Sequence, residues 1–115
     1  MKILKGRWEI LKPDKVLSML GIAAKAHGVV SGEYQTEHAV KSGEAYLVIV
    51  AEDASENTRK MFSNMCEFYQ IEIAFYGTRE SLGHCIGKEF RASLAIVDEG
   101  LAKSVRKKLI QTTTE

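Results

Sequence analysis

Apolar residues and one histidine recur at helical spacing in a first stretch that follows Pro13. They are Val16, Leu17, Leu20, Ala23, Ala24 and His27. Pro13 lies near the start of this stretch and Gly28 lies just beyond its end, an asymmetry that is typical of helices. The pattern therefore predicts a helix from about Asp14 to His27.

The next segment predicts a short strand and a second helix. Val29 and Val30 favour a strand that ends at Ser31, and Ser31 and Gly32 open a helix that runs to Ser42. The side of this helix expected to face the core holds Thr36, Ala39, Val40 and Gly43. The opposite, exposed side holds Tyr34, His38 and Lys41, with Gln35 on its flank.

A continuous β-favouring run at Leu47–Ala51 predicts a strand that is covered on both faces. Asp53 and Glu56 resemble a capping box and so predict the start of a long helix. The face of this helix expected to be buried holds Thr58, Met61, Phe62, Met65, Cys66 and Tyr69.

The last part of the chain predicts two more strands, at Ile71–Tyr76 and Ser93–Val97. Between them Thr78 caps a short helix that runs through His84 and ends around Gly87. Asp98 begins a last helix, whose apolar side holds Leu101, Ala102, Val105 and Leu109.

Strands that alternate with helices predict an α/β fold with one mixed, largely parallel, four-stranded sheet between helices. We expect a three-layer α/β/α sandwich. The chain of 115 residues has the length of one domain, which we place at residues 13–110. Residues 1–12 form an N-terminal extension, and the tail of residues 111–115 is expected to fray.

The charge balance limits the kind of surface that could bind nucleic acid. With 16 basic and 15 acidic residues the net charge is +1, so such a site must be a local patch. Cys66 and Cys85 do not form a disulfide framework and indicate two buried thiols in a reducing compartment. The longest apolar run, Leu47–Ala51, is too short to span a membrane, and we expect a cytoplasmic protein.

The start of the second helix is the first candidate for a binding surface. Its exposed side offers a ring that can stack, an amide that can read a base edge and cations that can meet phosphate. Free N–H groups at Ser31 and Gly32 would favour an anion there. The alternative is a solvated helix face with a Glu37–Lys41 ion pair.

A second candidate is the turn that precedes the fourth strand. Phe90 lies between two cations and could stack on a base from a mobile loop; alternatively it folds back onto the sheet edge. A third candidate is the basic group on the last helix, which is alternatively a solvated helix end. This group consists of Lys103, Arg106, Lys107 and Lys108.

Catalytic motifs are sparse. The three histidines lack the spacing of a helical zinc site, and no nucleophile elbow or phosphate-binding glycine motif occurs. Glu52 and Asp53 end a strand, where an acid could act in catalysis, but capping the next helix also accounts for Asp53. We therefore expect no catalytic residues, no metal, no cofactor and no enzymatic activity.

Three groups of residues resemble the kink-turn RNA-binding ribosomal-protein family of large-subunit proteins L-seven-Ae and L-thirty-e. The first group is Val30-Ser31-Gly32, Lys41-Ser42-Gly43 and Leu47 to Asp53. The second is Leu82-Gly83, Ile86-Gly87-Lys88 and Ala95-Ile96-Val97. The third, Glu52 to Thr58, Gly77 to Gly83 and Asp98 to Lys103, resembles the small bacterial YlxQ-like branch. Together the match runs from about Asp14 to Ile110.

The resemblance implies where RNA would bind. The family contacts kink-turns through a G-x-N-E-x-x-K segment, onto which Gly32, Tyr34, Gln35 and His38 fall, so that only the glycine is kept. The second RNA element of the family is a loop whose apolar residues meet a flipped-out nucleotide. It falls on Lys88, Glu89, Phe90 and Arg91. With the residues singled out above, we expect RNA to be bound by Lys25, Ser31, Gly32, Tyr34, Gln35, His38, Lys41, Lys88, Glu89, Phe90 and Arg91.

The resemblance further implies a non-catalytic protein that binds structured, kink-turn-like RNA in translation or ribosome biogenesis. Ribosomal or translation proteins are possible additional partners, no membrane is involved, and a monomer is expected. The alternative is a protein-interaction module of the translation machinery that kept the fold and lost specific RNA recognition. Salt dependence separates the two, because phosphate contacts weaken steeply with salt.

Overall fold

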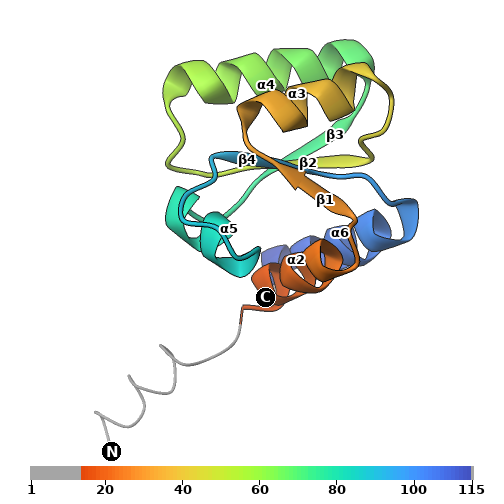
Figure 1. Ribbon diagram of the computed structural model, residues 1–115, viewed down its shortest axis with the longest axis vertical. Coiled ribbons are helices and arrows are strands. Elements are labelled where there is room, and N and C mark those ends of the chain that lie inside the picture. Colours follow the sequence, from red (N-terminus) through yellow and green to blue (C-terminus); the bar gives the residue numbers. More distant parts are fainter. Residues whose placement is uncertain (1–13, 115) are drawn as a thin grey trace, which may run out of the picture.

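A computed structural model describes residues 14–114 (Figure 1). The predicted extension at residues 1–12 therefore lies outside the described residues, as do Pro13 and Glu115. The elements, in chain order, are α2 (Lys15–Lys25), β1 (Val29–Ser31), α3 (Glu33–Lys41), β2 (Leu47–Val50), α4 (Glu56–Tyr69), β3 (Glu72–Phe75), α5 (Arg79–Cys85), β4 (Ser93–Ile96) and α6 (Glu99–Thr114). The predicted alternation of helices and strands is confirmed.

The four strands form one mixed sheet in the order β1-β4-β2-β3. Strand β4 runs antiparallel to both of its neighbours, and only β2 and β3 are parallel. The expectation of a largely parallel sheet is therefore wrong. Helix α5 is only about 10 Å long, and the chain returns beside it: the Arg91 N–H donates to the Arg79 carbonyl at 3.0 Å. Strand β4 therefore begins at the same end of the sheet at which β3 finishes, and it runs in the opposite direction to β3.

The layers are those of an α/β/α sandwich, which confirms the predicted fold class. Helices α3 and α4 cover one face of the sheet, and α2, α5 and α6 cover the other (Figure 1). Every residue of the central strands β2 and β4 is buried, as expected for a strand covered on both faces. Phe62 of α4 is the largest side chain that is fully buried in this core.

Two helix ends differ from the prediction. Helix α2 ends at Lys25 and is capped by Ala26, while His27 is exposed and has a positive φ of 61°. Helix α4 is capped by Ser55, whose Oγ accepts the Thr58 N–H at 3.1 Å. Asp53 instead accepts the N–H of Arg79 at 2.8 Å, so it connects the end of β2 to the start of α5.

The predicted faces of α3 and α4 are confirmed with two corrections. Thr36, Ala39 and Val40 are buried, but Gly43 is exposed because the helix has already ended. On α4, Phe62 and Cys66 are buried and Thr58, Met61 and Met65 are half-buried. Tyr69, at the last position of this helix, is exposed rather than buried.

The C-terminal helix is longer than predicted. Helix α6 continues to Thr114, while the expected fraying of residues 111–115 stays a prediction. No glycine or proline follows Ile110, and the sequence therefore contains no residue that would end the helix there. Within residues 14–114, no helix has both the length and the apolar character needed to cross a bilayer.

The two cysteines differ in burial. Cys66 is buried, as expected, whereas Cys85 is only half-buried and lies between α2 and α5. Burial raises the pKa of both thiols to about 11, so both are protonated near neutral pH.

Candidate nucleic-acid interface

The turn from β1 into α3 has a backbone that only glycine adopts easily. Gly32 is the N-cap of α3 with φ 92°, and its N–H donates to the Ser93 carbonyl at 2.9 Å. The expectation of a free N–H at Gly32 is therefore wrong. No side chain caps the helix, so the first-turn N–H groups are the ones left to meet an anion.

The exposed stripe of α3 is present as predicted, but one of its cations already has a partner. Tyr34 is 77% exposed, and its ring lies 6.4 Å from that of His38 with an angle of 13° between the planes. Gln35 is also exposed. The Lys41 Nζ donates to Glu37 Oε2 at 2.7 Å, and this hydrogen bond raises the pKa of Lys41. The exposed stripe therefore offers mainly two aromatic rings and one amide, and little unpaired positive charge.

The loop before β4 rests directly on α5. A Cβ added to Gly83 would lie 2.5 Å from the carbonyl oxygen of Glu89 and 2.9 Å from the Cα of Phe90. The Lys88 N–H also donates to the Gly83 carbonyl at 2.8 Å. Phe90 is nevertheless 59% exposed, so its ring is not folded back onto the sheet. Lys88 and Glu89 are exposed as well.

Arg91 joins this loop to the start of α3. Its Nε–H donates to Ser31 Oγ at 3.1 Å, and its Nη1 donates to the carbonyl of Phe90 at 2.7 Å. Beneath this contact, the buried Ser93 Oγ donates to Thr36 Oγ1 at 3.3 Å, so α3 is also held to the start of β4. The start of α3 and the loop before β4 are the two surfaces predicted from the sequence. They therefore lie side by side at one end of the sheet.

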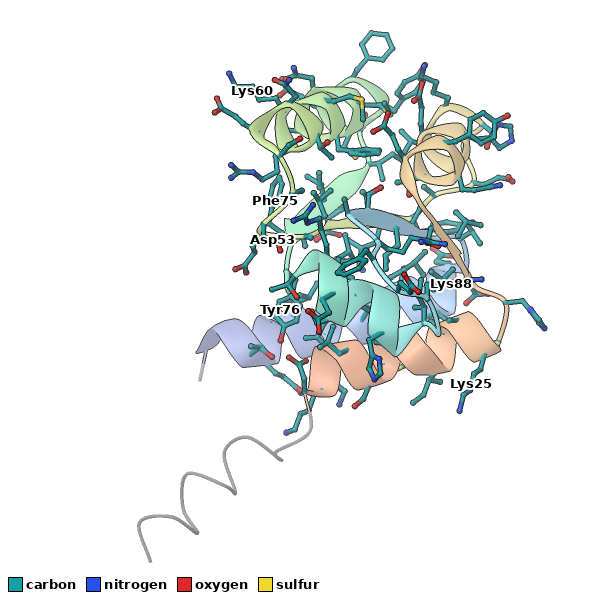
Figure 2. All side chains as sticks on the ribbon, turned by 60° about the vertical axis from the view of Figure 1, so that its left-hand side comes forward. Lys25, Asp53, Lys60, Phe75, Tyr76 and Lys88 are labelled. Carbon is teal, nitrogen blue, oxygen red and sulfur yellow. The ribbon has the colours of Figure 1, made fainter. Side chains whose placement is uncertain are left out.

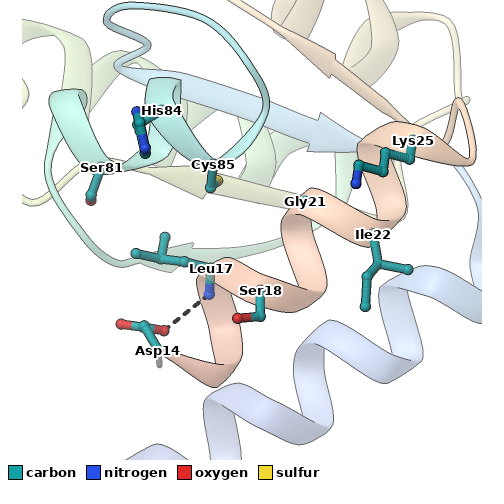
Figure 3. A pocket seen from close by; sticks show the side chains of 9 residues that line it. All are labelled: Asp14, Leu17, Ser18, Gly21, Ile22, Lys25, Ser81, His84 and Cys85. Atoms are coloured by element: carbon teal, nitrogen blue, oxygen red, sulfur yellow. Dashed lines mark hydrogen bonds between the residues drawn. The ribbon is translucent and has the colours of Figure 1, made fainter. Parts of the chain in front are cut away.

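Lys25 lies at the end of α2, on the wall of an open groove between α2 and α5 (Figure 3). The groove is mostly apolar, with Leu17 and Ile22 on its wall, and a neighbouring hollow connects Lys25 with Gly87 at the start of the loop. Figure 2 shows Lys25 and Lys88 on the same side of the molecule. Lys25 is thus close to the start of the loop.

The basic group on α6 is not part of this surface. The Nε–H of Arg106 donates to Glu72 Oε1 at 2.5 Å, at the edge strand β3 on the far side of the sheet from β1. Lys103 and Lys107 are exposed. The Arg106–Glu72 contact and the exposure of the two lysines favour the alternative of a solvated part of the helix, although α6 continues to Thr114 and these residues are not at its end.

Among residues 14–114, no group of three His, Cys, Asp or Glu side chains could hold a metal ion. The expected absence of a metal, a cofactor and catalysis stays a prediction. Sequence reasoning missed the contacts of Gly83, Arg91 and Ser93; for Arg91 and Ser93 the reason is that their partners Ser31 and Thr36 are distant in the chain. Only Thr36 carried a signal, since a hydroxyl on a core-facing side needs a hydrogen-bond partner.

Comparison with known proteins identifies relatives of this chain. Residues 14–106 match the family described as "Ribosomal protein L7Ae/L30e/S12e/Gadd45 family". RNA-binding protein YlxQ of Bacillus subtilis (strain 168) is 38% identical over 87 residues, which cover 76% of this chain and 87% of that protein. RNA-binding protein YlxQ of Enterococcus faecium is 33% identical over 93 residues, which cover 81% of this chain and 89% of that protein.

Solved structures show the same fold. A protein of unknown function from Bacillus halodurans C superposes with a TM-score of 0.82 at 36% identity, covering 85% of this chain and 99% of that one. The Giardia lamblia 15.5kD RNA-binding protein superposes with a TM-score of 0.73 at 20% identity, covering 87% of this chain and 86% of that one. At this low identity the second comparison supports the fold alone.

Proposed function

Because this chain belongs to the ribosomal protein L7Ae/L30e/S12e/Gadd45 family, we propose that it is a non-catalytic protein that binds structured RNA. The names of its YlxQ relatives support RNA as the partner. The RNA would be kink-turn-like, and the context would be translation or ribosome biogenesis in the cytoplasm. We propose that the protein acts as a monomer, with ribosomal or translation proteins as possible further partners.

One observation carries the proposal: the Arg91–Ser31 hydrogen bond places the Phe90 loop beside the start of α3. Two exposed aromatic side chains, Tyr34 and Phe90, therefore belong to one end of the sheet. A base that leaves an RNA helix can stack on such a ring, and stacking is tolerant of sequence. A kinked RNA, whose bases are splayed out at the bend, would suit this arrangement.

Each residue of the surface has a proposed role. Tyr34 and Phe90 would stack on bases, the Gln35 amide would read a base edge, and the glycine backbone at Gly32 would permit close approach. Glu89 would lie beside the stacked base on the loop. Phosphates would be met by Lys25, His38, Lys41 and Lys88. For Lys41 this requires exchanging its bond to Glu37 for one to the RNA.

The proposal is tested by measuring binding of the full chain to a kink-turn hairpin and to a hairpin of the same length without the bulge. We expect preference for the kinked RNA and a steep loss of affinity with salt, by a slope of roughly 0.7–0.9 per phosphate contact. Lys88→Ala should lower that slope. Lys107→Ala, which removes an exposed cation from α6, should leave it unchanged.

The possible results separate the parts of the proposal. Equal affinity for the two hairpins would overturn kink-turn recognition and keep RNA binding. Absence of binding to either RNA would overturn the RNA-binding function itself. If the chain were instead found on a translation protein with an affinity that hardly depends on salt, it would be an interaction module.

A further inference from the structure

We propose that Arg91 is a positioning residue of the RNA surface, which holds the Phe90 loop against the β1–α3 turn and does not itself contact phosphate. The RNA part of this inference rests on the proposed function. The resemblance to the family suggested a phosphate contact at Arg91, and the hydrogen bonds of its guanidinium group point to the different role.

The guanidinium group of Arg91 donates two hydrogen bonds at once. Its Nε–H bonds Ser31 Oγ at 3.1 Å while its Nη1 bonds the Phe90 carbonyl at 2.7 Å. The planar group presents several N–H donors in a fixed relative orientation, so it can hold two acceptors at once. A lysine ammonium keeps the charge but lacks this planar fork. The arrangement therefore depends on the shape of arginine more than on its charge.

The two acceptors belong to the two halves of the candidate surface. Ser31 directly precedes Gly32, the N-cap of α3, and the second acceptor is the carbonyl of the stacking residue Phe90. The loop is also held to α5 by the Lys88 N–H, but that bond says nothing about its distance from α3. The Gly32 N–H joins the turn to Ser93 at the start of β4, but among residues 14–114 the Arg91 side chain makes the one described hydrogen bond between the loop itself and the β1–α3 turn.

Burial argues against a phosphate contact. Arg91 is half-buried and two of its five N–H donors are engaged with the protein, so fewer donors are left for a phosphate and the group is held where its two acceptors place it. Lys88, three residues earlier, is exposed and has no ion pair with any residue of 14–114. A free cation of this kind is the better phosphate partner, because it loses no contact on binding.

The test compares Arg91→Lys, Arg91→Ala and Ser31→Ala in the full chain, with the kink-turn hairpin as the RNA probe. We expect Arg91→Lys to weaken binding roughly fivefold, about as much as Arg91→Ala, since a hydrogen bond contributes about 1 kcal/mol. Ser31→Ala should weaken binding in the same direction. The slope of log affinity against log salt should not change in any of the three variants.

A different result overturns the inference. If Arg91→Lys binds like the wild type while Arg91→Ala lowers the slope by roughly 0.7–0.9, Arg91 is a phosphate contact. Thermal unfolding of each variant shows whether it is folded, so that lost binding is not mistaken for lost structure.

A measurement without RNA keeps this test separate from the proposed function. In nitrogen-15 NMR spectra of the free wild-type chain, the Arg91 Nε–H should exchange slowly with water, and Ser31→Ala should accelerate the exchange. If the wild-type proton exchanges as fast as in Ser31→Ala, Arg91 does not hold the loop and the inference is wrong. If the proton is protected but no RNA binds, the proposed function fails while Arg91 still holds the loop.

Discussion

The exposed face of α3 and the loop before β4 contribute to the same surface in different ways. On α3, Tyr34, Gln35 and His38 project from a regular helix whose buried side is defined by local periodicity. The loop has no such period, and its position comes from the close approach of its backbone to Gly83 and from the bond of Arg91 to Ser31, which is distant in the chain. A helix face can therefore be predicted from spacing alone, whereas the position of a loop depends on its tertiary contacts.

The two regions also differ in available charge. The lysine of the exposed stripe, Lys41, is bonded to Glu37, whereas Lys88 in the loop is exposed and has no ion pair within residues 14–114. The helix thus offers mainly rings and an amide, and the loop offers a ring and a cation. Because the net charge of the chain is only +1, phosphate binding must depend on a few local cations such as Lys88.

The largest effect is expected for Gly83→Ala, which would force the loop away from α5. The added Cβ would meet the Glu89 backbone at 2.5 Å, and backbone atoms cannot move aside as a flexible side chain can. Overpacking of this kind costs about 1–3 kcal/mol of unfolding free energy, and displacement of Phe90 should weaken RNA binding as well. Denaturant unfolding and an RNA titration measure the two effects.

Gly100→Ala is the matched control, since this glycine is also in a helix and its added Cβ would approach only Asp98 Oδ2, at 3.4 Å. It should leave RNA binding unchanged and stability equal or higher by up to about 1 kcal/mol. If both alanine variants were equally stable, the contact between α5 and the loop would be looser than the structure indicates.

The second effect is a gain of affinity on the helix. Replacing Tyr34, Gln35 and His38 by Asn, Glu and Lys restores the motif of the family on exposed positions. A bidentate base contact is worth about 1–3 kcal/mol, and the new cation adds a phosphate contact, so binding to a standard kink-turn should tighten. The hairpin without the bulge should gain only the salt-dependent part. Unchanged affinity for the kink-turn would mean that α3 does not face the RNA.

Much of the fold could be predicted because its signals are local. The buried strand at Leu47–Val50 and the apolar side of α3 were predicted from β-favouring runs and helical spacing. The exposure of Phe90 was one of two alternatives, and the cations beside it favoured the one that the structure shows. For the strand and the helix the residue types and their spacing were sufficient evidence, whereas at Phe90 they only favoured one alternative.

The parts that were mispredicted or missed depend on long-range contacts. The direction of β4 is set by where the chain re-enters the sheet, which the alternation of elements does not indicate. Asp53 has the spacing of a helix cap, but it bonds the N–H of Arg79, 26 residues away. The hydrogen bond from Arg91 to Ser31 was missed for the same reason, since the two residues are 60 positions apart.

The third effect concerns the ring of the loop. Phe90→Ala should weaken RNA binding by about 1–3 kcal/mol, the usual contribution of one base stacked on an aromatic side chain. Stability should change little because the ring is exposed; a ring packed in the core would cost about 3–5 kcal/mol instead. Phe68→Ala is the control, since Phe68 is 78% exposed at the end of α4 and lies outside the proposed surface. Equal losses in the two variants would refute stacking at Phe90.

The smallest effect is expected for Glu37→Gln. This substitution would make the available positive charge of α3 more similar to that of the loop. It removes the negative charge that pairs with Lys41 and so makes its ammonium more available to a phosphate. The slope of log affinity against log salt should become steeper by up to roughly 0.7–0.9, while the stability of the fold should hardly change, because exposed ion pairs contribute little. Glu56→Gln is a matched control, because it frees Lys60 from the same type of helical pair (3.3 Å). Lys60 lies on the opposite side of the molecule from Lys88 in Figure 2, so its release should not alter the slope. If both variants steepened the slope equally, the change would reflect the net charge of the protein. The proposed phosphate contact of α3 would then be wrong.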